Sequence, residues 1–464
     1  MILLLLSILA AGFAYLLFYK PEWIAVALFT MIISSYNLQM QGMPMNLRAI
    51  ISFALLLRIM ADNKTHRQYI TFFGLTSTLL LLGYLAYTCL VNYWQDLFTA
   101  EILKQRISAF IGVYCAFHFY YFKKNADLLK YALILSGFLC FLDLAYTYLF
   151  FGTFPVRRVL EFLTVSEVVD YGHEGFYNGA NHNFFGQITG MTFLLLITEA
   201  IKKHPVIRKL LFLAPLMLLS VALSTSRSSI FAVIIGIIYC FYLLYKTPEQ
   251  RKMIMRMTIW SGGSLALIFL LFFTLRSFFH LEGNFADELM LRLVDEPTAM
   301  LKKSLGQSYD IQNLSSMDWR EEASANAYAS YSKLNMDEQL FGIGQDGFIL
   351  RNLGNGLNPH NGVMIILIEY GLIGFLMYLI LFLLIVGEMR RVKNASSALF
   401  MVILFVVIYG LPQNNELTST TLLLFMFSLV AENRDILQQI NAGARQRKPL
   451  FKYKDSSRVV SLSS

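Results

Sequence analysis

The sequence predicts an all-α fold, a polytopic bundle of transmembrane helices with a large, partly helical outer loop. Of the 464 residues, 56% are hydrophobic and only 15% are charged, whereas a soluble domain carries about 25% charged residues. The apolar residues lie in runs long enough to cross a bilayer. Short blocks of Lys and Arg separate these runs, as is typical of membrane helices with a defined orientation.

A helix that crosses the hydrocarbon core needs about 20 apolar residues. Runs near this length lie at 1–19, 69–91, 107–122, 128–151, 184–201, 210–224, 230–245, 257–276, 361–388, 395–412 and 418–432. Two shorter runs, 23–36 and 47–60, bring the expected total to about 12–13 spans. The first run has no basic segment before it and no small-residue cleavage site, so we expect it to be retained as a helix.

The basic blocks predict the orientation of the chain. If the spans alternate, one side of the membrane receives the blocks at 64–67, 123–124, 202–209, 246–256, 390–393 and 434–458. That side is the cytoplasm by the positive-inside rule. Two smaller pairs, Lys104 with Arg106 and Arg157 with Arg158, fall on the other side. The expected divisions are N-terminal helices at 1–276 with an outer loop at 152–183, an extracytoplasmic loop at 277–360, C-terminal helices at 361–432 and a basic cytoplasmic tail at 433–464.

The predicted loop at 277–360 is far longer than an ordinary connection. It contains twelve acidic and six basic residues, an excess that agrees with an outside location. Within 316–336, one helical face is marked by Trp319, Ala323, Ala327, Tyr331 and Leu334. This spacing predicts an amphipathic helix. The stretch FGIGQDGF that follows predicts a Gly-rich turn.

Several function classes find no support in the sequence. It contains no Walker A motif, no GxGxxG after a strand and no HExxH. The cysteines, Cys89, Cys115, Cys140 and Cys240, lie in apolar runs without a CxxC pair, so we expect no disulfide framework, no metal and no cofactor. The net charge of +8 lies between apolar runs, which does not favour a nucleic-acid partner.

Arg227 is the first candidate functional residue, because a charge at membrane depth is costly unless it serves a function. It lies in LSTSRSSIF, at the outer turn between two predicted spans, and hydroxyl residues including Ser226 flank it. A guanidinium with such neighbours can hold a phosphate group. The alternative is an arginine that only reaches lipid headgroups.

His360 is the second candidate. It opens the span at 361–388 just before Asn361, which can cap the helix, and a histidine there can act as a general base. The alternative is an interfacial or capping residue without chemistry. Glu369 lies inside the same span and needs a partner.

Arg320 and His182 complete the set of candidates. Arg320 lies on the predicted loop helix, where a local ion pair with Asp318 or Glu321 is the plainer explanation. His182 lies at the outer mouth of the span at 184–201 and could line a cavity.

Residues 319–374, together with an upstream Ser-Arg element, resemble the O-antigen ligase and polymerase superfamily. That family has an Arg heading a loop helix, a Gly-x-Gly turn, and then His-Asn opening a helix with a downstream Glu-x-Gly. The matching residues are Ser226, Arg227, Arg320, Gly342, Gly344, His360, Asn361, Glu369, Gly371 and Gly374. Ser228 departs from the glycine that frequently follows the first Arg, which could alter how closely a diphosphate approaches.

The resemblance implies a metal-independent membrane glycosyltransferase of the GT-C type. Its donor would be a glycan on undecaprenyl diphosphate, and an acceptor hydroxyl would attack the anomeric carbon. Arg227 and Arg320 would bind the diphosphate, and His360 would activate or orient the acceptor. The protein would lie in the bacterial inner membrane, with its active site facing the periplasm or the outside.

Several functional hypotheses stay open. The leading one is a polysaccharide or O-antigen polymerase, and the second is an O-antigen ligase that moves a finished glycan to lipid A core or a protein. A transporter or flippase for lipid-linked sugar would favour inverted repeats and broken helices near the midplane. We find no repeat, and the candidate residues cluster at the outer face. A structural or sensory protein would leave Arg227, Arg320 and His360 unexplained. Beyond donor, acceptor and bilayer, the resemblance suggests a polysaccharide flippase and a chain-length regulator as partners.

Overall fold

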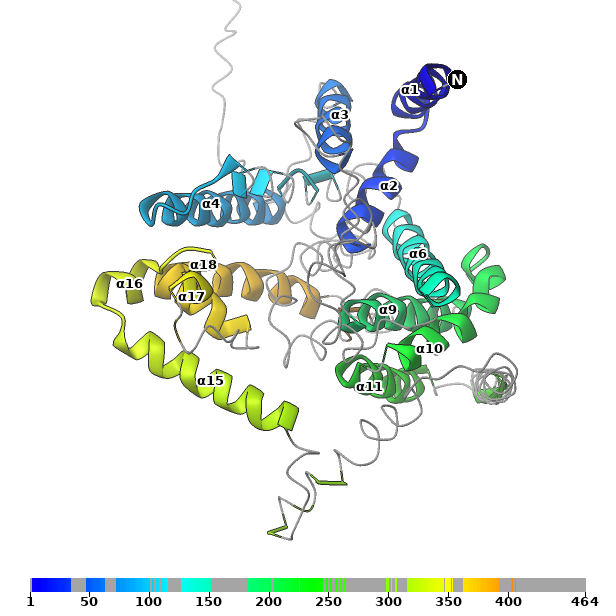
Figure 1. Ribbon diagram of the computed structural model, residues 1–464. Coiled ribbons are helices and arrows are strands. Elements are labelled where there is room, and N and C mark those ends of the chain that lie inside the picture. Colours follow the sequence, from blue (N-terminus) through cyan, green and yellow to red (C-terminus); the bar gives the residue numbers. More distant parts are fainter. Residues whose placement is uncertain are drawn as a thin grey trace, which may run out of the picture.

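The computed structural model describes residues 2–34, 47–62, 72–100, 127–151, 182–201, 204–224, 226–244, 315–345, 347–351 and 362–391, with short stretches elsewhere between 102 and 405. These residues form helices and no strand (Figure 1). The helices are α1 (Ile2–Tyr19), α2 (Pro21–Ser34), α3 (Leu47–Asp62), α4 (Phe72–Trp94), α6 (Leu128–Phe151), α9 (His182–Ile201), η3 (Ile207–Leu213), α10 (Ala214–Leu223), α11 (Arg227–Leu244), α15 (Ser315–Lys333), α16 (Met336–Phe341), α17 (Gly347–Leu350) and α18 (Gly362–Arg391).

Helix α9 lies at the centre of one group of helices and packs against α6, α10 and α11. Its described side chains are almost all buried, as expected of a helix that is apolar on every face. Close approach depends on small residues, because a Cβ added at Gly186 would lie 2.5 Å from the Ser224 hydroxyl oxygen. The hydroxyls of Thr189 and Thr192 donate to backbone carbonyls four residues earlier. Small and hydroxyl residues at helix contacts are typical of packing within a membrane.

A second group consists of α4, α18 and the three helices α15, α16 and α17 of the predicted outer loop. The predicted amphipathic face is confirmed where side chains are described. Ala323 and Ala327 are fully buried. Ala327 packs with Ile343, Phe348 and Ile368, the last of which belongs to α18. The predicted loop therefore contains ordered helices that pack on α18.

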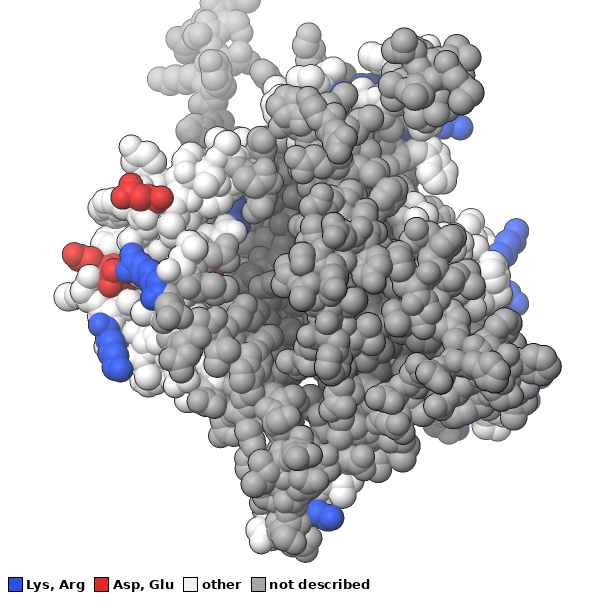
Figure 2. Space-filling model, in the orientation of Figure 1, with Lys and Arg blue, Asp and Glu red and all other residues white. Residues whose placement is uncertain are grey.

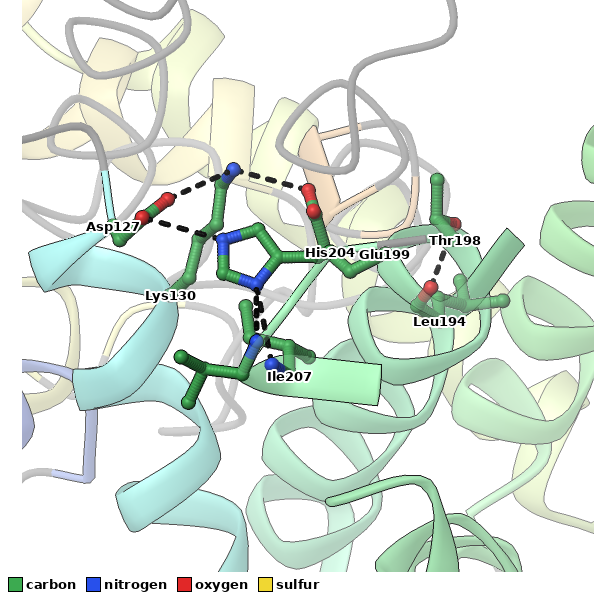
Figure 3. Close-up of polar contacts among 8 residues, drawn as sticks. Asp127, Lys130, Leu194, Thr198, Glu199, His204 and Ile207 are labelled. Carbon is green, nitrogen blue, oxygen red and sulfur yellow. Dashed lines mark hydrogen bonds and ion pairs between the residues drawn. The ribbon is translucent and has the colours of Figure 1, made fainter. Parts of the chain in front are cut away.

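The start of α6 meets the end of α9 through a cluster of ionisable side chains (Figure 3). The ammonium of Lys130 lies 3.0 Å from the Glu199 carboxylate and 3.4 Å from that of Asp127. His204 Nδ1 accepts a hydrogen bond from the Ile207 backbone N–H at 3.1 Å. Its Nε2 therefore carries the proton and donates to Asp127 at 3.2 Å. The cluster joins α6, α9 and η3 at one end of the bundle.

Seven predicted spans are confirmed as helices over most of their length, namely the runs at 1–19, 23–36, 47–60, 69–91, 128–151, 184–201 and 230–245. The runs at 107–122, 257–276, 395–412 and 418–432 lie largely or wholly outside the described residues. The number of crossings, the orientation and the domain limits stay predictions.

By length and composition, one helix among the described residues could cross a membrane, at Gly362–Leu384. A second candidate is the pair Ala11–Tyr19 and Pro21–Ile33, which is bent by 110°. The ring of Pro21 fits the first turn of a new helix, where its missing N–H costs nothing.

Two predicted spans are interrupted. We expected one uninterrupted helix at 361–388, but α18 contains a non-helical residue, Gly371, with φ 64° and ψ −174°. We expected one helix at 210–224, but residues Ile207–Leu213 form a 3₁₀ helix and α10 has only 10 residues. Hydropathy reports apolar length and not backbone dihedrals, so neither interruption was visible in it.

Candidate functional site

The turn at Gly342 and Gly344 adopts a backbone conformation that favours glycine. Their φ angles are 89° and 85°, in the region where a side chain is strained. Gly342 ends α16, which begins with a capping box formed by Asn335 and Glu338. A Cβ added at Gly342 would lie 2.3 Å from the carbonyl oxygen of Glu369. The turn thus approaches α18 more closely than any residue with a side chain could.

The interruption of α18 at Gly371 receives this turn. In a continuous helix the carbonyls of Ile368 and Glu369 would accept from residues four positions later. Here they accept instead from the N–H groups of Ile343 at 3.0 Å and Gly344 at 2.9 Å. A Cβ added at Gly371 would lie 2.3 Å from the Leu340 carbonyl oxygen. The broken helix and the glycine turn therefore satisfy each other's backbone groups, and we call this contact the glycine interlock.

The last turns of α4 support the glycine interlock from the other side. The Tyr87 hydroxyl lies 3.1 Å from the Phe341 carbonyl oxygen and 3.0 Å from that of Tyr370. Gln95 Nε2 donates to the Gly342 carbonyl at 3.0 Å. Asn92 Oδ1 accepts from the Gln345 N–H at 2.7 Å. The C-terminal end of α4 and the predicted outer loop therefore lie on the same side of the molecule.

Arg106 also joins the glycine interlock, and sequence reasoning missed it. Its Nη2 donates to Gln345 Oε1 at 2.8 Å and lies 2.7 Å from the Tyr370 hydroxyl. Its guanidinium carbon also lies 5.8 Å from the centroid of the Tyr370 ring. The available signal was its position on the side of the membrane that is poor in basic residues.

Tyr331 and Gln339 hold α15 against α16. The Tyr331 hydroxyl donates to the Gln339 carbonyl at 3.2 Å, and Gln339 Nε2 donates to the Leu334 carbonyl at 2.9 Å. Burial raises the pKa of the Tyr331 hydroxyl, so this donor keeps its proton at neutral pH. The C-terminal end of α15 is thereby fixed relative to the glycine interlock. Arg320 lies on the same helix, nearer its start.

The Ser-Arg element lies at the junction of α10 and α11. Ser226 is buried, and its hydroxyl oxygen accepts from the Ser229 hydroxyl at 2.9 Å. Arg227 is the first residue of α11. Because Gly186 of α9 contacts Ser224 and Ser229, the junction lies beside the first turns of α9, which begins at His182. The structure therefore places the backbones of His182 and Arg227 at one end of the bundle.

The candidates fall into two described groups. One contains His182, Ser226 and Arg227, and the other contains Gly342, Gly344 and Glu369. The backbone of Arg320 belongs to α15, which packs on α18. His360 and Asn361 lie outside the described residues, as do the side chains of Arg227, Arg320 and His182. Within the described part of the chain, no three His, Cys, Asp or Glu side chains gather as metal ligands.

The comparison with protein families decides the affiliation of this region. Residues 212–379 match the family model described as O-Antigen ligase. This span is an O-antigen ligase family domain. It contains Arg227, Arg320, His360, Glu369 and the glycine interlock, so the resemblance to the O-antigen ligase and polymerase superfamily is confirmed for this part of the chain. No curated protein matches the chain.

The family match supports a membrane protein that takes part in polysaccharide synthesis by a ligase or polymerase type of glycosyl transfer. Arg106 and His182 lie outside the matched residues. The support that α4 and Arg106 give to the glycine interlock is therefore supplied by the part of the chain before the O-antigen ligase domain.

Proposed function

We propose that this protein transfers a glycan from undecaprenyl diphosphate to a sugar hydroxyl, and that it acts as a polysaccharide polymerase. The O-antigen ligase domain at 212–379 supports glycosyl transfer. The proposal adds the donor, the direction of attack and the polymerase role. It also places the reaction on the outer face of the inner membrane, with no metal ion and no cofactor.

The reaction forms one glycosidic bond and breaks one bond to phosphate. The acceptor hydroxyl oxygen attacks the anomeric carbon at the reducing end of the donor glycan, and the bond to the diphosphate oxygen breaks. The acceptor proton passes to His360, which acts as the general base. Arg227 and Arg320 stabilise the negative charge that develops on the leaving lipid diphosphate.

The glycine interlock is the observation that carries this proposal. It replaces the missing helical hydrogen bonds of α18 with bonds to the outer loop, so the loop and the helix after His360 hold one geometry. A fixed relation between the loop helix of Arg320 and the helix that follows His360 suits a reaction in which both side chains must meet one substrate.

The ligase remains the second candidate, because the matching family model carries that description. Both enzymes share the donor and the leaving group, and they differ in the acceptor. A gene position beside a flippase and sugar transferases would favour the polymerase.

The test is a turnover assay with the purified protein in nanodiscs and a labelled undecaprenyl-diphosphate repeat unit from the source cells. We expect wild type to produce a ladder of longer lipid-linked glycans. Arg227→Ala, Arg320→Ala and His360→Ala lose the ladder, whereas Arg208→Ala, which removes an exposed arginine of η3, keeps it.

Products that appear only after another acceptor is added would replace the polymerase with the ligase. Full activity in the folded His360→Ala variant would remove the proposed base. The folding of each variant is checked by size-exclusion chromatography and thermal unfolding, so that a loss of activity refers to chemistry.

A further inference from the structure

We propose that a surface beside the glycine interlock binds the sugar chain of the substrate. We call it the aromatic–polar surface and define it by Trp94, Gln95, Glu338 and Arg351. The inference rests on the proposed function, because it assigns a subsite to the glycan that is transferred or extended.

The aromatic–polar surface is assembled from distant parts of the chain. The ring of Trp94 lies 5.3 Å from that of Phe341, between centroids. Arg351 Nη2 donates to Gln95 Oε1 at 2.7 Å, and Arg351 also pairs with Glu338. Since Gln95 Nε2 donates to the Gly342 carbonyl, the surface forms only when the outer loop is docked on α4.

One large aromatic ring is left open on this surface, because Trp94 is 65% exposed although it contacts Phe341. Two residues later, Asp96 has a φ of 56° and turns the chain out of α4. Tryptophan rings with one open face are enriched at binding interfaces.

The charged groups beside the ring are already engaged with one another. Arg351 pairs with Glu338 and donates to Gln95. In Figure 2, acidic and basic side chains gather at the left edge of the view, over α16 and the end of α4. A lipid phosphate would have to displace Glu338 from the guanidinium of Arg351, and lipid hydrocarbon would meet charged groups.

A sugar chain fits both features of the surface. One face of a pyranose ring consists of C–H groups, which bury apolar area against an aromatic ring. Its rim carries hydroxyls, which donate to carboxylate and amide oxygens and accept from guanidinium N–H groups. Gln95, Glu338 and Arg351 supply all three kinds of partner beside Trp94. The aromatic–polar surface can therefore hold a neutral sugar while other residues hold the diphosphate.

Binding is measured without catalysis, with the lipid-free oligosaccharide repeat unit and the protein in nanodiscs, by isothermal titration and saturation-transfer NMR. We expect Trp94→Ala to weaken affinity about tenfold, in keeping with the loss of one stacked ring. Trp94→Phe retains most of the affinity. The control is Trp23→Ala, which removes a 57% exposed tryptophan in the first turn of α2 and leaves affinity unchanged.

Steady-state kinetics of Trp94→Ala then show whether the bound sugar belongs to the acceptor or to the donor. A higher KM for the acceptor in Trp94→Ala assigns the surface to the growing chain, and a higher KM for the lipid-linked donor assigns it to the donor glycan. Equal affinity of Trp94→Ala and wild type, or no oligosaccharide binding by wild type, overturns the proposal. A variant that only loses thermal stability in nanodiscs would show that Trp94 is an interfacial anchor.

The outcomes separate this inference from the proposed function. If the oligosaccharide binds through Trp94 but no glycan is transferred, the surface stands and the transferase proposal fails. If transfer proceeds normally in Trp94→Ala with unchanged affinity, the transferase stands and the surface fails.

Discussion

At the scale of single residues, glycines set how closely the outer loop approaches the membrane helices. Gly342 and Gly371 each lie against the backbone of the other segment, and neither position has space for a Cβ. Gly-rich sequence at 341–348 predicted the turn. The partner of that turn was not predictable, because Gly371 lies in an apolar run whose hydropathy is the same whether the helix is continuous or broken. Long-range backbone pairing leaves no local sequence pattern.

The close approach at Gly342 makes a stability prediction. Gly342→Ala adds left-handed strain and a collision with the Glu369 carbonyl, and we expect it to lower the free energy of unfolding by about 2–5 kcal/mol. The matched control is Gly306→Ala, because Gly306 also has a positive φ, 66°, but no described atom lies within 4 Å of an added Cβ. The control loses only about 1–2 kcal/mol.

Thermal unfolding in nanodiscs, compared at one scan rate, measures both glycine variants. Limited proteolysis of the outer loop should also become faster in Gly342→Ala. If the two variants had equal melting temperatures, the collision with the Glu369 carbonyl would cost no stability. The close approach at Gly342 would then not contribute to the stability of the protein.

At the scale of elements, helical positions followed from apolar periodicity, and contacts between helices did not. The spacing of Ala323 and Ala327 predicted which face of α15 is buried. By contrast, Lys130 and Glu199 lie in apolar segments far apart in sequence, and nothing local shows that they pair. Arg106 is likewise an exception to the positive-inside rule. Its partners Gln345 and Tyr370 explain its position, and they are distant in sequence.

The contact between α6 and α9 makes a second stability prediction. The side chains of Lys130 and Glu199 are only 5% and 3% exposed. Lys130→Met removes the ammonium beside the buried Glu199 carboxylate, whereas Glu199→Leu leaves Lys130 with Asp127. We expect Lys130→Met alone to cost about 3–5 kcal/mol and Glu199→Leu alone to cost less, because Asp127 still pairs with Lys130. The double variant regains most of that loss, because two apolar side chains need no pairing.

Melting temperatures of the four proteins form a double-mutant cycle that checks this coupling. A double variant that loses as much stability as the two single variants combined would mean that Lys130 and Glu199 act independently. Transferase activity serves as a second readout, since the ion pair lies at the end of α9 away from His182 and its removal should affect stability first.

At the scale of the whole molecule, the ends of helices meet in three places. The end of α4 contacts the outer loop, and the α10–α11 junction contacts the start of α9. The start of α6 meets the opposite end of α9. Along α9, the junction that carries Arg227 and the Lys130 cluster therefore lie at opposite ends. The direction in which each end points across the membrane follows only from the basic blocks of the sequence.

Oriented proteoliposomes with labelled undecaprenyl-diphosphate glycan on the outer face test the central claim most directly. Single-turnover release of undecaprenyl diphosphate is followed together with the position of the label. A transferase releases the lipid diphosphate on that face when an acceptor is present, and His360→Ala abolishes the release. If folded wild type, supplied with its own donor and acceptors, releases no lipid diphosphate and instead moves the intact donor across the bilayer, the protein is a transporter and the glycosyl-transfer account is wrong.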